Sequence, residues 1–349
     1  MKRLFRFKKL AVVVLAMVVT GAMRMPVEQK MTEDFRERRI AAPKLSVETW
    51  NQMGQTSLAG TFGGLRSVMA SILSLEAQDH FTEQEWYELK QDYDVITSLD
   101  PYNSFYWSHG GWHLAYNAAS WARNRQDLKP IQRETMEREY LEAGDAFYRR
   151  GLKHLPDDHH LWGELGSLWA NKFKRPDLER ALEAYKMAAS FGRSTIYARR
   201  YVYVLAQIPD REIEAYEEAR KLVEENPDHL RLASFRSILY ALWTNPSLPM
   251  SEGRPDILEI FATEESAYRD LYNYRLRTYE EGYFRGSIED TLRILANRID
   301  APVDWNPFLV NSKYRIPKDF RNKRNIMRNQ RSPVPAQNFP YNSYLNGGN

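Results

Sequence analysis

The spacing of the turns is the feature that most constrains how this chain can fold. Pro101, Pro156 and Pro227, each beside an Asp or Asn, separate stretches with the apolar periodicity of helices. The interval from Pro156 to Pro227 fits two repeats of about 34 residues. The interval from Pro101 to Pro156 fits one such repeat with an insertion, which we place in the polar stretch 124–133. A period of about 34 residues is typical of stacked helix pairs.

The residues that follow Pro156 repeat the pattern of a helix that packs on one face. Trp162, Leu165, Gly166 and Trp169 stand at spacings of three, one and three. Because residues three and four apart share one helix face, these positions pack against a second helix. We interpret them as packing positions and not as a ligand site.

A triplet of small, aromatic and small residues marks the second helix of each unit. Its members are Gly144, Tyr148 and Gly151, then Ala181, Tyr185 and Ala188, and in a weaker form Ala215, Ala219 and Leu222. The small residues allow the paired helix to approach closely, and the aromatic ring fills the space between neighbouring units. One unit cannot bury such a face alone, so the units must stack.

These patterns predict an all-α fold with about six helix pairs. The predicted pairs are 57–79 with 83–98, 103–120 with 133–154, 159–172 with 177–190, 194–207 with 210–225, a degenerate pair from Asp228, and 264–284 with 287–299. The predicted organisation is an N-terminal signal or anchor over 1–30, a linker over 31–56, the array over 57–300 and a tail over 301–349.

The run Trp162-x-x-Leu165-Gly166-x-x-Trp169 resembles the first-helix signature of the tetratricopeptide repeat (TPR) superfamily, and a looser likeness extends over about 80–245. The resemblance implies a right-handed superhelical array of antiparallel helix pairs. It also implies a groove, lined by the first helix of each pair, that holds a peptide or helix. Residues 55–120, with Phe62-Gly63-Gly64-Leu65-Arg66, further resemble a bacterial family of membrane-tethered TPR proteins that has no assigned reaction.

The N-terminus has the pattern of an export segment. Five cations lie within residues 1–9, and an apolar run extends from Leu10 to Met23. This pattern predicts a cleaved secretory signal or, since the run is shorter than the roughly 20 residues of a spanning helix, a signal anchor aided by snorkelling lysines. A buried internal helix is the alternative. We expect the body to lie outside the cytoplasm, in the periplasm or at the cell surface, either tethered or secreted.

Composition narrows the chemistry that the chain can perform. The chain has no cysteine, which excludes disulfides, thiolate metal sites and cysteine nucleophiles. Residues 1–30 and 301–349 each carry a net charge of +6, and because the whole chain carries +3, residues 31–300 carry −9. The sequence shows no nucleophile elbow, so we expect no catalytic residues and no cofactor.

Two groups of residues suggest a ligand but have simpler interpretations. Gly60, Gly63 and Gly64 lack the strand and the Gly-Lys-Ser/Thr run of a phosphate loop, so we interpret them as close helix packing. The run 157–160, Asp-Asp-His-His, could hold a metal, but adjacent histidines on a helix point in different directions. We expect these aspartates to cap a helix and expect no metal site.

His109 and His113 are four residues apart on the helix that carries Trp107 and Trp112. That spacing could face one substrate or metal, yet no HExxH-type carboxylate accompanies it. We therefore predict packing or groove-lining histidines, with a small-ligand site or an enzyme as the alternative. The predicted partner-binding groove contains Trp107, His109, Trp112, His113, His160, Gly163 and Ser167.

The tail from Ala301 is rich in Pro and Asn, and it interleaves aromatic residues with cations. It could wrap its own acidic array, dock on a partner as an arm, or bind an anionic polymer. The residues that we predict to dock are Arg321, Lys323, Arg324, Arg328, Phe339 and Tyr341. The sequence as a whole predicts a non-enzymatic scaffold that assembles proteins at the cell envelope, contacts the membrane through its N-terminal segment, and does not bind nucleic acid.

Overall fold

The computed structural model describes residues 19–20, 23–46, 49, 65–248, 256–278 and 285–300 of the 349. Within these ranges every regular element is helical and no strand is present, which confirms the all-α prediction. The chain divides into two compact units, Met1–Ile208 and Pro209–Asn349. The array that the sequence predicts over 57–300 is therefore shared between two units, which are described in turn.

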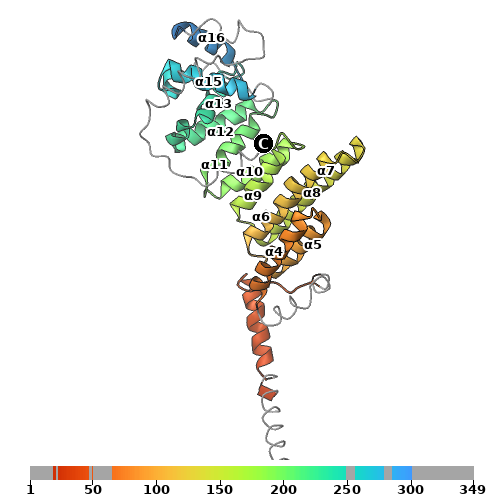
Figure 1. Ribbon diagram of the computed structural model, residues 1–349. Helices are drawn as coiled ribbons and strands as arrows, with labels where there is room; N and C mark the ends of the chain where they lie inside the picture. The colour runs from red at the N-terminus through yellow and green to blue at the C-terminus, as the bar shows by residue number, and fades with distance from the viewer. Residues whose placement is uncertain are drawn as a thin grey trace, which may run out of the picture. The chain divides into compact units, whose positions relative to one another are not determined.

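The first unit consists of successive helix pairs that follow one another in chain order (Figure 1). Its elements are α4 (Arg66–Thr82), α5 (Trp86–Leu99), α6 (Ser104–Trp112), the π-helix η1 (His113–Ala118), α7 (Ala119–Asn124), α8 (Pro130–His154), α9 (His159–Trp169), α10 (Leu178–Ser190) and α11 (Thr195–Leu205). Residues 23–37 are also helical. α4 pairs with α5, the continuous helix α6–η1–α7 pairs with α8, and α9 pairs with α10, as the sequence predicts.

The insertion between Pro101 and Pro156 is not confined to the polar stretch 124–133, where the sequence analysis places it. Only residues 125–129 connect α7 to α8, and Pro130 is the first residue of α8. The missing N–H and fixed backbone angle of proline suit a first helical position, so Pro130 begins a helix instead of interrupting one. The insertion thus lengthens both helices of the second pair.

The repeat phase is visible in matching contacts. The indole N–H of Trp107 donates to the carbonyl of Pro101 at 2.9 Å, and Trp162 donates to Pro156 at 2.9 Å. Helix starts are capped as well: the Asp158 carboxylate accepts hydrogen bonds from the backbone amides of the second and third residues after it, which confirms its predicted role. The sequence phase therefore reports real structural equivalence between the units.

Contacts between glycines and aromatic rings hold each pair together, and the tyrosines of the triplets lie against the first helix of their own pair, whereas the sequence placed them between units. A side chain added at Gly111 would overlap the ring of Tyr148, and one added at Gly166 would overlap the ring of Tyr185. Both tyrosines belong to the predicted triplets, and both are buried. The close approach of first and second helices thus depends on a glycine that faces a tyrosine in each pair.

Neighbouring second helices are linked through charges. Arg150 of α8 pairs with Asp94 of α5 at 2.6 Å, and Arg180 of α10 pairs with Glu142 of α8 at 3.0 Å. First helices meet through smaller contacts, such as the one at 3.1 Å between the hydroxyl oxygens of Ser71 in α4 and Tyr106 in α6. The first unit is therefore an array in which like helices are neighbours.

The second unit contains α12 (Glu212–Glu225), the 3-10 helix η2 (Pro227–Arg231), α13 (Ala233–Trp243), α14 (Ile257–Ile260), α15 (Glu264–Thr278) and α16 (Ile288–Arg298). α15 pairs with α16, as the sequence predicts, and α12 packs against η2 and α13. The predicted pair 194–207 with 210–225 is divided, because α11 belongs to the first unit and α12 to the second.

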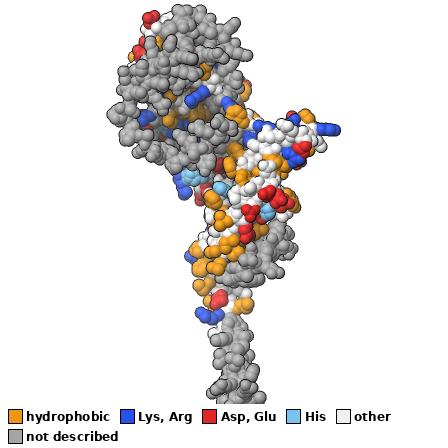
Figure 2. Space-filling model, viewed as in Figure 1, with side chains coloured by type: hydrophobic (Ala, Val, Ile, Leu, Met, Phe, Trp, Pro, Cys, Tyr) orange, Lys and Arg blue, Asp and Glu red, His pale blue; other side chains and the backbone are white. Residues whose placement is uncertain are grey.

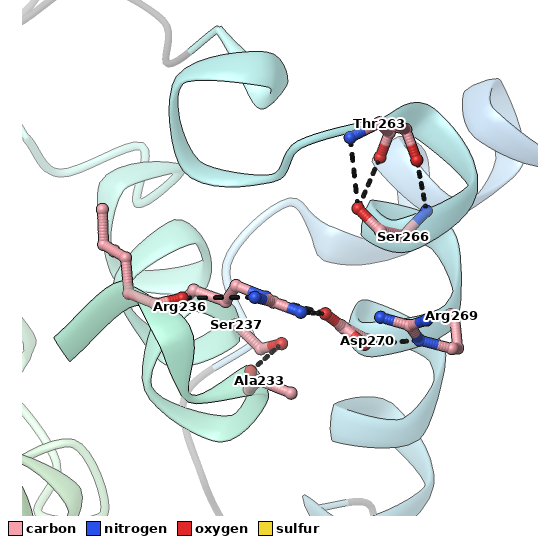
Figure 3. A network of polar contacts seen from close by, with 8 residues as sticks. Ala233, Arg236, Ser237, Thr263, Ser266, Arg269 and Asp270 are labelled. Atoms are coloured by element: carbon pink, nitrogen blue, oxygen red, sulfur yellow. Dashed lines mark hydrogen bonds and ion pairs between the residues drawn. The ribbon is translucent and has the colours of Figure 1, made fainter. Parts of the chain in front are cut away.

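A buried ion pair connects α13 to α15 in the second unit (Figure 3). The Asp270 carboxylate is only 3% exposed and accepts hydrogen bonds from Arg236 and from Arg269. At the start of α15, Thr263 and Ser266 cap the helix by exchanging hydrogen bonds between side chain and backbone. The pair is satisfied from both sides, as a buried carboxylate requires.

Candidate functional site

The seven predicted groove residues fall into two separate clusters on the first helices. Trp107, His109, Trp112 and His113 lie at the junction of α6 and η1, which we call the His113 cluster. His160, Gly163 and Ser167 lie on α9. Ser167 forms the second cluster with residues of α10 and α11, and His160 and Gly163 lie at its border.

The first cluster is mostly packing. Trp107 is buried and its ring stacks on His154 of α8, so its predicted place in the groove is wrong: it faces the second helix of its own pair. His113 is buried between the rings of Phe81 and Tyr93, whose centroids are 4.7 and 5.6 Å from its own. Phe81 and Tyr93 come from the preceding pair, so His113 fills the space between two units.

The surroundings of His113 keep its imidazole neutral. Burial, with a smaller contribution from His109, lowers the pKa of His113 to about 4. Burial also lowers the pKa of His109, whose ring lies 4.2 Å from that of Phe105. A neutral imidazole among aromatic rings is a packing group, and only His109 and the 37% exposed Trp112 offer surface to a ligand.

The π-helix η1 begins at His113, where the backbone winds one residue more per turn than an α-helix. The asparagine one turn later, Asn117, places its side-chain amide nitrogen 3.2 Å from the imidazole Nδ1 of His113. Such wide turns are frequent at functional sites. No sequence signal in this segment indicates the π-helix.

The second cluster is polar and connects three helices; we call Glu164, Ser167, Tyr185, Tyr197 and Arg200 the Ser167 cluster. The Ser167 hydroxyl donates to the Gly163 carbonyl at 2.8 Å. It accepts hydrogen bonds from the Arg200 guanidinium at 2.7 Å and from the Tyr185 hydroxyl at 3.1 Å. Ser167 is thus the meeting point of α9, α10 and α11.

Gly163 and His160 border this cluster. A side chain at Gly163 would overlap the ring of Tyr197 in α11, so this glycine sets the approach of two first helices and is too buried to touch a partner. His160 is exposed, and its Nδ1 lies 3.3 Å from the Tyr197 hydroxyl. Of the three predicted residues on α9, His160 and Ser167 remain candidates for contact with a ligand.

Several residues of this face were not predicted from the sequence. Lys174 donates to the Tyr116 carbonyl at 3.2 Å and to the Ser120 hydroxyl at 2.7 Å, and burial lowers the pKa of its ammonium to about 8. Burial raises the pKa of Glu164, although the positive charge of Arg200 opposes that effect. The sequence contains one signal that could have identified Arg200: this cation directly precedes the apolar and aromatic run 201–205.

The remaining candidates resolve as follows. In the run 157–160, which could hold a metal, the rings of His159 and His160 lie 4.1 Å apart, and the Asp158 carboxylate caps α9. Across the described ranges, no group of three side chains that could bind a metal is found. Gly60, Gly63, Gly64, most of the N-terminal apolar run and the whole tail from Ala301 lie outside the described residues. No helix among the described residues has the length and hydropathy needed to cross a membrane.

Comparisons of the chain with protein-family models, with curated proteins and with solved structures give no match.

Proposed function

We propose that this chain is a non-enzymatic scaffold of the TPR kind that binds protein segments on the surface of its first helices α6, α9 and α11. The observation that supports this proposal concerns two cations, Arg200 of α11 and Lys174 of the connection after α9, which differ from paired cations such as Arg123 of α7. On the second helices, charges such as those of Arg150 and Arg180 are paired with carboxylates of neighbouring helices. On the first-helix face, Arg200 and Lys174 bond only to neutral oxygens among the described residues.

Partly buried cations that bond to no carboxylate are costly to desolvate, and a bound molecule can supply the missing acceptor. Aromatic rings lie next to both cations: the Lys174 ammonium is 5.6 Å from the centroid of the Tyr116 ring, and the Arg200 guanidinium is 5.7 Å from that of Tyr185. Tyrosine and arginine are residue types that contribute most at binding surfaces. This combination favours a binding surface over a catalytic site.

The proposal places the scaffold at the cell envelope, outside the cytoplasm, tethered or secreted through its N-terminal segment. It assigns the basic, aromatic tail the part of a docking arm, with Arg321, Lys323, Arg324, Arg328, Phe339 and Tyr341 as its contact residues. Both assignments rest on the sequence patterns of these segments.

The test is affinity capture from envelope membranes with the full-length chain and two matched variants. Arg200→Gln changes the first-helix surface, and Arg180→Gln changes an exposed ion pair of the second helices. We expect a discrete set of proteins that is lost with Arg200→Gln, retained with Arg180→Gln, and reduced when residues 301–349 are removed. The same set on all variants, or no enriched protein at all, would overturn the proposal; circular dichroism checks that each variant is folded.

The alternative function is a small-ligand site or an enzyme built around His109 and His113, for which the π-helix η1 gives some support. Replacing His109 by Ala leaves the buried His113 in place and removes the partly exposed imidazole of the pair. The alternative predicts weaker binding of a ligand found by screening a metabolite mixture against the full-length chain. The scaffold proposal predicts no ligand in that screen.

A further inference from the structure

The Ser167 cluster contains two opposite charges that do not meet. Glu164 lies one turn before Ser167 on α9, and the Ser167 hydroxyl accepts a hydrogen bond from Arg200 of α11 at 2.7 Å. The charge of Arg200 therefore favours the ionised carboxylate of Glu164, yet the structure records no ion pair between them. The Arg200 guanidinium uses Nη1 for Ser167 and Tyr185, which leaves Nε and Nη2 without an acceptor among the described residues. The Glu164 carboxylate, likewise, accepts no hydrogen bond from any residue that the structure describes.

A third polar group near this pair is unsatisfied. The Tyr148 hydroxyl is fully buried and has no hydrogen-bond partner among the described residues. The charge of Glu164 adds to burial in raising the pKa of Tyr148, which places this hydroxyl within electrostatic reach of the carboxylate. Tyr148 is too buried to reach a ligand, but Glu164 and Arg200 are only partly buried, so a ligand can contact these two groups and supply the hydrogen bonds that they lack.

The charges limit what that ligand can be. A carboxylate would be attracted by Arg200 and repelled by Glu164, and an ammonium group would face the reverse. A neutral group that both accepts and donates satisfies both residues at once. The side-chain carboxamide of Asn or Gln has one acceptor oxygen and two N–H donors in a plane, which is the complement of a guanidinium donor and a carboxylate acceptor.

We infer that Glu164 and Arg200 together form a subsite for the side-chain carboxamide of an Asn or Gln residue in a bound protein segment. The inference rests on the proposed function, because it names the chemistry of the segment that the first-helix surface holds. Arg200 donates to the carboxamide oxygen and Glu164 accepts from its N–H groups. Ser167 and Tyr185 hold Arg200 in position.

The experiment uses an array of short acetylated peptides with random flanks and a fixed central residue: Asn, Gln, Asp, Glu, Lys or Leu. The labelled full-length chain is applied to this array. We expect peptides with central Asn or Gln to bind about tenfold better than those with Leu, because a hydrogen bond to a charged group contributes about 1.5 kcal/mol or more.

Two near-isosteric variants change the predicted preference in opposite directions. Glu164→Gln leaves a cation and shifts the preference towards Asp and Glu, whereas Arg200→Gln leaves an anion and shifts it towards Lys. The control Arg180→Gln, on the second helices, leaves the Asn and Gln preference unchanged. Thermal unfolding confirms that all three variants are folded.

The outcomes separate this inference from the proposed function. Peptide binding whose central-residue preference ignores Glu164→Gln and Arg200→Gln overturns the carboxamide subsite and leaves the scaffold proposal standing. No binding to any peptide overturns both. A preference of the unmodified chain for Asp or Lys over Asn also overturns the subsite, because it would show that one charge acts alone.

Discussion

At the scale of single residues, His113 shows how a buried base couples the array to pH. Its pKa in the folded chain is about 4, against 6.5 for an ordinary histidine. When folding lowers the pKa of a base, the fold has its full stability at pH values above the ordinary pKa. As the pH falls towards the pKa of the folded chain, the unfolded chain binds the proton more readily, so the free energy of unfolding decreases. The relevant window therefore runs from about pH 6.5 down to about pH 4.

We predict that the free energy of unfolding falls between pH 7 and pH 4.5 by about 2–3 kcal/mol that His113 accounts for. His113→Leu removes this part of the pH dependence, and urea unfolding at the two pH values measures it. His80, beside Asp92, has a raised pKa, because its side-chain hydrogen bond to that carboxylate favours the charged form. The stabilisation that His80 contributes is therefore present at low pH and lost as the pH rises, which is the opposite of the effect of His113. An unchanged pH profile in His113→Leu would contradict the prediction.

Gly166 offers a second test at this scale. A methyl group there would lie 2.6 Å from the ring of Tyr185, so Gly166→Ala should destabilise the chain by about 1–3 kcal/mol. In the background Tyr185→Ala the same change should become neutral or stabilising, because alanine is the better helix former. Chemical unfolding of the four chains gives the coupling energy. Simple additivity would show that the two residues do not constrain each other.

At the scale of helices, the sequence predicts position better than length. Asp158 and Gly166, which faces Tyr185, were predicted because caps and helix spacing are local properties. The insertion was placed at 124–133 because these residues are polar, yet α8 begins at Pro130 within that stretch. An exposed helix can be polar as well, and only tertiary packing distinguishes the two cases.

In the candidate site as well, the residues fixed by local sequence patterns were predicted, and those fixed by tertiary packing were not. His160 and Ser167 were predicted because they sit on the first helix at the repeat phase. Glu164 and Arg200 were missed, since nothing in one sequence states that two charged residues from different helices lie near each other without pairing. Trp107 was misplaced because an aromatic residue has the same pattern whether it faces a partner or a second helix.

We expect the stability of the second unit to fall strongly when the buried ion pair between α13 and α15 loses one of its partners. Asp270→Asn should cost about 3–5 kcal/mol, since it leaves the Arg236 guanidinium, only 18% exposed, without its carboxylate. Replacing both residues together, as Arg236→Met with Asp270→Leu, should recover much of that loss. Chemical unfolding with a probe in the second unit measures both. Equal losses in the single and the double variant would contradict the idea that the unpaired charge is the cause.

At the scale of the whole molecule, stacked units stabilise one another through their neighbours. Within Met1–Ile208, a helix pair precedes α9, and α11 follows the α9–α10 pair. In contrast, four apolar side chains at or within α4 are each at least 41% exposed: Leu65, Val68, Ile72 and Leu75. Figure 2 shows hydrophobic side chains gathered on the surface of this N-terminal part of the array. Stability within the first unit should therefore be uneven.

We predict that native-state hydrogen exchange is slowest in α8 and α9 and roughly tenfold or more faster in α4, because α4 opens without disturbing a preceding pair. Mass spectrometry of peptides from the full-length chain, at several denaturant concentrations, measures the opening free energies. Equal protection in α4 and α9 would mean that the first unit opens as a single block.

The wide turn of η1 changes the direction in which the side chains that follow it point. An α-helix advances about 100° per residue, so the one additional residue in η1 turns everything after it by about that angle. A heptad wheel drawn from Trp107 thus gives the wrong side for Tyr116 and Ser120. Deleting one residue within His113–Ala118 would restore the regular wheel, swing these side chains away from Lys174, and dismantle this surface without any change to its chemistry.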